Sequence, residues 1–130
     1  MTTVAFVDES TAGKQSDAWH LEIFEETLSL RELIRRRVFQ EVAEHNAKNT
    51  PVFNGLVQPE DAEVTLNGYR LRKARTIDAG KQFDKAVEAF DRNGYVVLVD
   101  DRQVEELDAV IDIAQGTTVT FLKLVPLVGG

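Results

Sequence analysis

The sequence of 130 residues contains no cysteine, and it has only two histidines, three prolines and one tryptophan. The absence of cysteine excludes disulfides, catalytic thiols, cysteine-based zinc sites and iron–sulfur ligation, and it is typical of proteins from a reducing compartment. The richest apolar stretches, such as residues 95–99, are far too short to cross a bilayer, and the chain begins without the basic and apolar regions of a secretory signal. We therefore expect a cytoplasmic protein without a membrane partner.

The chain also has fewer positively charged than negatively charged residues. The 15 lysines and arginines stand against 22 aspartates and glutamates, which gives a formal net charge of −7. Such a chain repels a phosphate backbone, so a nucleic-acid partner is not expected. With 43% hydrophobic and 28% charged residues the composition is that of an ordinary globular protein, and the length fits one domain.

Two strands are predicted at the start of the chain. Residues 2–7 and 19–25 have the composition of strands, and in the second of them Leu21 and Ile23 alternate with polar side chains. The polar residues 9–17 between the two predict a rather long hairpin loop.

A helix is predicted to begin at Ser29. The Ser29 hydroxyl can cap the first turn, and Glu32 three residues later completes a capping box. Apolar residues then recur every three or four positions as a stripe that we expect to pack on a core, and the helix is expected to end near Asn46. The stripe consists of Leu30, Leu33, Ile34, Val38 and Val42.

The middle of the chain predicts a hairpin and a second helix. Asn67-Gly68 stands between two alternating segments and is the preferred pair for a type I′ turn. Asp78 can cap a second helix of about four turns. We expect Gly94 to end this helix in the left-handed conformation.

The last part of the chain predicts a central strand and a final strand. Residues 95–99 form a nearly continuous apolar, β-branched run that turns at residues 100–101 into a short segment around Val104. Residues 117–125 are the last expected strand. The tail 126–130 begins with a proline, which ends the ladder, and we expect this tail to be flexible.

No catalytic constellation is recognisable in the sequence. His20 and His45 have no partner at metal-ligand spacing, and the pairs of consecutive acidic residues are typical of solvated turns. A Gly-x-Ser-x-Gly elbow and a glycine-rich phosphate loop after a strand are both missing. We therefore expect no catalytic residue, no metal site and no bound cofactor, and the chain is not expected to be an enzyme.

One basic run, Arg35-Arg36-Arg37, interrupts the acidic chain. Glu32 precedes Arg36 by four residues and Arg37 precedes Glu41 by four, the spacing of ion pairs on a helix surface. We interpret the run as a solvated helix face. The alternative interpretation is a docking site for an acidic partner.

The end of the sequence is its most unusual feature. A strand rich in valine and leucine is followed by a proline, an extended apolar segment and Gly129-Gly130. Such an end can present a terminal carboxylate away from the domain. An enzyme that activates this carboxylate as an acyl-adenylate needs residues without Cβ, which can thread a narrow channel to the nucleotide.

These elements together resemble the β-grasp family of ubiquitin and of the sulfur carriers ThiS and MoaD. The resemblance covers residues 2–46 and 95–130, and it is most specific in the last strand and tail, FLKLVPLVGG. Residues 47–94, with their hairpin and helix, depart from the family pattern as an insertion. The resemblance implies an α+β fold in one domain, 1–125, with a mixed sheet, a capped helix across one face and the tail 126–130. In this sheet the strand 2–7 is expected to lie beside both 19–25 and 117–125, with the first and last strands parallel.

The resemblance also implies site residues. Gly130 supplies the activated carboxyl group, Gly129 is the thin neck, and Leu127 and Val128 hold the tail in the activating enzyme. The exposed sheet face near Phe121, Leu122 and Leu124 is expected to be the docking surface for that enzyme. The partner enzyme uses ATP, and the chain itself needs no cofactor.

Three functions stay open on this resemblance. The first is a bacterial-type ubiquitin-like modifier, which an activating enzyme adenylates and which is attached to amines of target proteins. This function implies a conjugating enzyme, a JAB-type metal peptidase and antiviral conjugation operons. The second is a sulfur carrier whose Gly130 becomes a thiocarboxylate, and the third is a non-covalent β-grasp interaction module.

Overall fold

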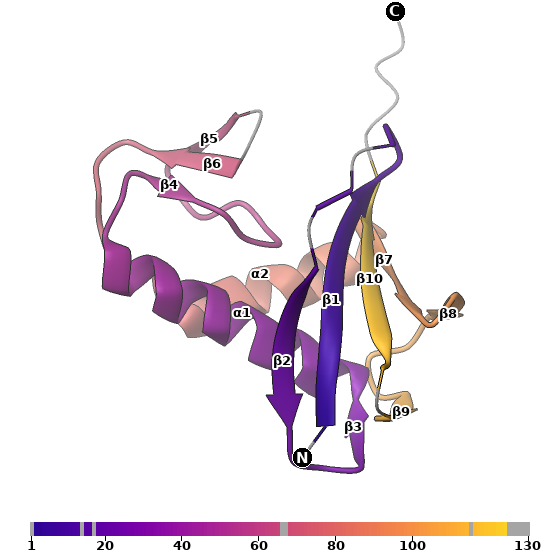
Figure 1. The fold of residues 1–130 in the computed structure, drawn as a ribbon. Helices are drawn as coiled ribbons and strands as arrows, with labels where there is room; N and C mark the ends of the chain where they lie inside the picture. Colours follow the sequence, from indigo (N-terminus) through magenta and orange to yellow (C-terminus); the bar gives the residue numbers. More distant parts are fainter. Residues whose placement is uncertain (1, 14, 17, 66–67, 115, 125–130) are drawn as a thin grey trace, which may run out of the picture. The chain divides into compact units, whose positions relative to one another are not determined.

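The computed structural model describes residues 2–13, 15–16, 18–65, 68–114 and 116–124, and it shows an α+β protein with a mixed sheet and two helices (Figure 1). The chain divides into two compact units. One unit comprises residues 1–31 and 90–130, and the other comprises residues 32–89.

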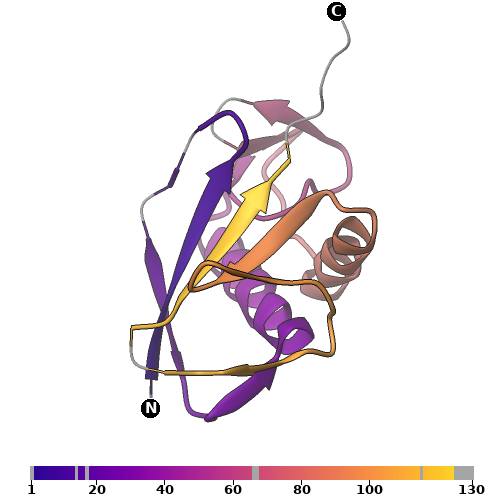
Figure 2. The same cartoon turned by 90° about the vertical axis from the view of Figure 1, so that its right-hand side faces the viewer.

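The first unit is built on a five-stranded sheet in the order β2-β1-β10-β7-β8. The predicted pairing of the first strand with both the second and the last is confirmed, because β1 is antiparallel to β2 and parallel to β10. Figure 2 shows β1, β10 and β7 side by side, in indigo, yellow and orange. The five strands are β1 (Thr2–Ser10), β2 (Trp19–Ile23), β7 (Tyr95–Val99), β8 (Arg102–Val104) and β10 (Thr118–Lys123).

One face of this sheet forms a core of aromatic and aliphatic side chains. The ring of Phe6 stacks on Trp19 with centroids 4.8 Å apart, and Phe121 lies 6.0 Å from both Phe6 and Tyr95. Because alternate residues of a strand point to opposite faces, the register aligns the core residues of neighbouring strands in rows. The fully buried members are Val4, Phe6, Ile23, Val97, Val119 and Phe121.

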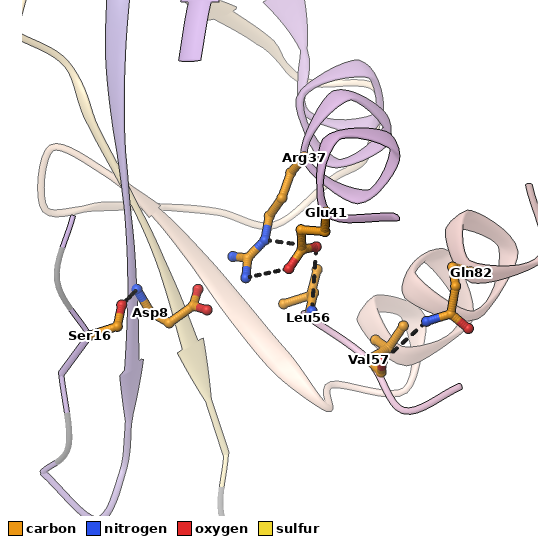
Figure 3. Close-up of polar contacts among 7 residues, drawn as sticks. All are labelled: Asp8, Ser16, Arg37, Glu41, Leu56, Val57 and Gln82. Carbon is orange, nitrogen blue, oxygen red and sulfur yellow. Dashed lines mark hydrogen bonds and ion pairs between the residues drawn. The ribbon is translucent and has the colours of Figure 1, made fainter. Parts of the chain in front are cut away.

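The first hairpin differs from its prediction. β1 continues to Ser10 rather than ending at residue 7, and β2 ends at Ile23 rather than at residue 25. The Asp8 N–H donates to the Ser16 hydroxyl at 2.9 Å, and the Ser16 N–H donates back to the Asp8 carbonyl at 2.8 Å (Figure 3). β1 continues into what the polar composition predicts as loop because residues 8–10 pair with β10, with Asp8 opposite Phe121 and Ser10 opposite Lys123.

A second, two-stranded sheet leads into the first helix. β3 (Thr27–Ser29) pairs with β9 (Val110–Asp112), and neither short strand is predicted from the sequence. Helix α1 (Leu30–Lys48) begins directly after Ser29, as predicted. Its first N–H groups donate to backbone carbonyls, Leu30 to Ala109 at 3.0 Å and Arg31 to Leu107 at 2.8 Å. Backbone partners thus satisfy donors that a helix start otherwise leaves open.

The second unit contains most of α1, a three-stranded sheet and most of α2. The sheet consists of β4 (Val52–Phe53), β6 (Gly68–Leu71) and β5 (Ala62–Thr65), in that order. Helix α2 spans Ala79–Asp91, and its N-terminus is capped as predicted, because the Asp78 carboxylate accepts from the Lys81 N–H at 3.0 Å.

Three boundaries in this part of the chain are corrected. Helix α1 ends at Lys48, two residues after the expected Asn46, and Asn49 follows with φ 51°. Gly68 is not a turn residue, because it lies in β6 opposite Thr65. After α2 the left-handed residue is Asn93, with φ 59°, and not Gly94.

Helix α1 carries a buried charged pair that the sequence places on the surface. Arg37 is only 1% exposed, so the interpretation of the basic run as a solvated helix face is wrong for this residue. Its Nη2 lies 3.4 Å and its Nε 3.3 Å from the two carboxylate oxygens of Glu41, and Glu41 also accepts from the Leu56 N–H at 3.4 Å (Figure 3). The pair therefore joins α1 to the segment that follows β4.

The other two arginines of the run behave as predicted for a helix surface. Arg35 and Arg36 donate to the two carboxylate oxygens of Glu32 at 3.0 and 3.1 Å. Partial burial acts to raise the pKa of Glu32, but the hydrogen bonds and positive charges of the two arginines outweigh it, and the pKa lies below its ordinary value of 4.5.

Candidate functional site

The end of β10 is held by hydrogen bonds on both sides. The Thr11 N–H, just beyond β1, donates to the Lys123 carbonyl at 3.1 Å. The Leu124 N–H donates to the Gly94 carbonyl, just before β7, at 3.2 Å. We call this place, formed by Thr11, Gly94, Lys123 and Leu124, the exit of β10. It defines where the chain leaves the sheet.

The residues expected to carry the chemistry follow this exit in the sequence. Leu127, Val128, Gly129 and Gly130 lie outside the described residues, as does the start of the expected flexible tail at residue 126. The described part of the site is therefore the surface next to the exit.

The predicted docking surface is corrected by the burial of Phe121. Phe121 is 0% exposed, and its ring belongs to the aromatic core of the other sheet face. Leu122 is half-buried and Leu124 is 39% exposed. Neighbouring residues of a strand point to opposite faces, so Phe121 and Leu122 cannot share a docking surface.

Leu122 belongs instead to an apolar row on the face opposite the core. The register places Leu122 beside Val96, and Thr120 between Val7 and Leu98. These side chains are half-buried, in contrast to the fully buried residues of the core face. We call Val7, Val96, Leu98, Thr120 and Leu122 the open sheet face.

The surroundings of the open sheet face are acidic. Glu9 is the register partner of Leu122, and on β2 the exposed Glu22 and His20 have the same orientation. Among the described strand residues that point to this side, none is lysine or arginine. A partner that covers this face would meet an apolar centre with negative charge at one side.

The two histidines lie in different environments. His20 is exposed on β2, whereas His45 is buried in the second unit, with its Nε2 3.0 Å from the Arg75 carbonyl and its ring edge-on to Phe53. Over the described ranges no three side chains of His, Asp or Glu are arranged to hold a metal ion. Within the same ranges no helix is both long and apolar enough to cross a bilayer.

The sequence analysis misses four residues of the open sheet face, which are Val7, Val96, Leu98 and Thr120. The signal is nevertheless present in the run YVVLV of β7, which is apolar at every position. A strand with one solvated face normally alternates between apolar and polar side chains. An uninterrupted run thus indicates either a covered sheet or an apolar patch on its outer face.

Comparison of the chain with protein-family models, with curated protein sequences and with solved structures finds no match.

Proposed function

We propose that this protein is a ubiquitin-like modifier with a β-grasp fold, and that the carboxylate of Gly130 is adenylated by a partner enzyme and transferred to amines of target proteins. The observation that carries the proposal is the anchored exit of β10, which lies beside the open sheet face and directly precedes the proline and the Gly129-Gly130 segment. An anchored exit lets a partner bind the sheet and receive the tail in one orientation.

The sheet topology supports the same proposal. A central parallel pair of first and last strands, flanked by antiparallel neighbours, is the arrangement expected of a β-grasp sheet. In this proposal residues 47–94 are an insertion, and their sheet and α2 are an additional surface for partners.

The proposed reaction needs no catalytic group from this chain. A carboxylate oxygen of Gly130 attacks the α-phosphorus of ATP on the activating enzyme, and pyrophosphate leaves. A target amine then attacks the carbonyl carbon of the adenylate and AMP leaves, or the acyl group first passes to an enzyme thiol with loss of AMP and the amine then displaces that thiol. Either route gives an amide and releases a proton. A conjugating enzyme and a JAB-type metal peptidase are proposed as further partners, the second to hydrolyse the amide.

The test is ATP–pyrophosphate exchange by the cognate activating enzyme. Gly129→Val should reduce exchange strongly, because a branched Cβ obstructs a narrow channel, and deletion of Gly130 should abolish it. Leu98→Asp on the open sheet face should raise KM for the protein more than it lowers kcat. Val64→Ala changes a 70% exposed side chain of β5 and serves as the matched control, with unchanged exchange. Equal exchange with all four variants would refute the proposal.

The fate of the acyl group separates this function from the sulfur carrier. Protein recovered from its own cells should show Gly130 as its terminal residue by intact mass, and other proteins should carry branched Gly-Gly peptides. A terminal thiocarboxylate without branched peptides would instead establish the sulfur carrier. An intact protein that is neither adenylated nor conjugated would leave only the non-covalent interaction module.

A further inference from the structure

Strand β8 has a free edge. The turn before the strand determines which of its backbone N–H and C=O groups point outward at this edge. Val99 pairs with Arg102, so Asp100 and Asp101 form a two-residue hairpin loop, and both have positive φ, 49° and 77°, as a type I′ turn requires. In such a hairpin the flanking residues, Val99 and Arg102, exchange hydrogen bonds with each other. The backbone N–H and C=O of the next residue, Gln103, therefore point away from β7.

The outer edge of the sheet is thus open at Gln103. β8 is the last strand in the sheet order, and in Figure 1 it lies outside β7. Among the described residues no further strand pairs with it, and its exposed Gln103 offers one main-chain donor and one acceptor. An unpaired edge of this kind is a template for an added strand.

Two cavities lie along this edge, and they share Gln103 and Val104. The first has a volume of about 240 Å³ and a mainly polar wall, and its lining includes Phe90, Tyr95 and the acidic Asp91. Because Gln103 and Val104, which line both cavities, belong to the edge strand, both cavities adjoin the place that a sixth strand would occupy.

The second cavity, of about 300 Å³, has apolar and polar walls in about equal parts. Its apolar residues include Val99, Ile111 and Val110, of which Val110 is 71% exposed, and its polar wall includes Asp112 and Arg102. Exposed apolar side chains next to an unpaired edge offer contacts for the alternate side chains of an added strand.

The segment that carries this edge holds most of the chain's excess negative charge. Residues 100–112 contain six acidic side chains and one basic one, a formal charge of −5 in a chain of net charge −7. Asp108 forms an ion pair with Arg31 at 3.3 Å. Glu105 lines the first cavity and Asp112 the second, and no ion pair in the described part of the chain involves either.

We propose that the edge of β8 binds an extended, basic peptide segment of a partner protein, which adds to the sheet as a sixth strand. The peptide backbone pairs with Gln103, an apolar side chain contacts Val110 and Ile111 in the second cavity, and lysine or arginine side chains meet Glu105 and Asp112. This binding does not depend on the chemistry of Gly130, so it can exist in a chain that is never adenylated.

Charge decides between this occupant and a second copy of the chain. Edge-to-edge pairing of two copies would bring two segments of formal charge −5 together, and like charges at such an interface are strongly unfavourable. A basic peptide is attracted by the same field. With one main-chain residue paired, we expect a dissociation constant of roughly 10 µM to 1 mM.

The experiment titrates the ¹⁵N-labelled full chain with an acetylated and amidated heptapeptide of alternating valine and lysine. The control probe has glutamate in place of lysine. Binding should shift the amide signals of Gln103 and of the cavity residues. Raising the ionic strength from about 0.05 M to about 0.5 M should weaken binding at least fivefold.

Two sets of variants test the contributions to binding separately, one for the backbone N–H of Gln103 and one for the acidic side chains. Gln103→Pro removes the outward N–H without removing a bond to β7 and should weaken binding about tenfold, whereas the matched control Gln103→Ala keeps the N–H and should bind as the wild type does. Glu105→Lys with Asp112→Lys should weaken binding of the basic probe and favour the acidic one. This double variant decides the test if Gln103→Pro fails to fold.

Four results would overturn the proposal. The first is that the basic probe fails to bind at millimolar concentration in this titration, and the second is that both probes bind equally. The third is that folded Gln103→Pro binds the basic probe as well as the wild type does. Finally, the amide signals of Gln103 and of the cavity residues shift with the concentration of the protein rather than with that of the peptide. The last result would assign the edge to a dimer. The ATP–pyrophosphate exchange assay depends on Gly130, whereas this titration measures binding at Gln103. Either proposal can therefore fail without the other.

Discussion

Breaking the buried ion pair of α1 should destabilise the protein far more than breaking its exposed counterpart. Arg37 and Glu41 have side-chain exposures of 1% and 10%, and the guanidinium lies along the carboxylate at 3.3 and 3.4 Å. Removal of one partner leaves a charge in a site that water scarcely reaches, and such changes cost roughly 3–5 kcal/mol. We therefore expect Arg37→Met to lower the free energy of unfolding by about 3 kcal/mol.

The double variant Arg37→Met with Glu41→Met should be more stable than either single variant. It leaves neither charge of the pair buried and roughly conserves volume, and its losses include the acceptor of the Leu56 N–H, worth about 1 kcal/mol. Arg35→Met is the matched control on the same helix, because the Arg35 side chain is 44% exposed and its ion pair should contribute at most about 1 kcal/mol.

Urea unfolding at neutral pH measures these differences as shifts of the midpoint at constant slope. For a chain of this length a loss of 3 kcal/mol corresponds to a fall in Tm of about 11 °C. The reasoning is refuted if Arg37→Met costs no more than Arg35→Met, or if the double variant loses the full sum of the two single changes.

Two further predictions concern the turn and the acidic start of α1. Asp101→Gly should stabilise the protein by about 0.5–1 kcal/mol in thermal unfolding, because Asp101 has φ 77° and glycine adopts positive φ without a steric penalty; a loss of stability would contradict the assigned turn. Glu32→Gln should cost about 0.5 kcal/mol at neutral pH, because two arginines stabilise the carboxylate. Since the folded pKa of Glu32 is lowered, its contribution is complete above the ordinary value of 4.5 and disappears as the pH falls through the folded pKa. A difference that persists in acid would show that charge is not the cause.

The sequence predicts the strands and helix starts that depend on local signals. Alternation gives β2, and the side chains of Ser29 and Asp78 locate the starts of α1 and α2 within one residue. The parallel pairing of β1 with β10 follows from the family resemblance rather than from local pattern, and the register confirms it. The short strands β3, β4 and β9 are missed because two or three residues carry no recognisable period.

Features that depend on tertiary packing are not visible in the sequence. The spacing of Arg37 and Glu41 fits a solvated pair as well as a buried one, and only the segment around Leu56 decides between them. Phe121 and Leu122 are equally apolar, so composition cannot say which of them faces the core. For the candidate site, the sequence predicts strand β10, which leads to the exit. Only the strand register shows which residues form the open sheet face beside it.

The central parallel pair also orders the folding of the chain. Ala5 lies opposite Thr118, so β1 is synthesised long before its parallel partner β10. Its hairpin with β2 can form locally, but its other edge stays unpaired during that interval, and such edges are prone to aggregation. Closing so long a loop raises the contact order, which slows folding. A translational pause or truncation before β10 would therefore leave a nascent chain with an open sheet, the species that a ribosome-associated chaperone would have to shield.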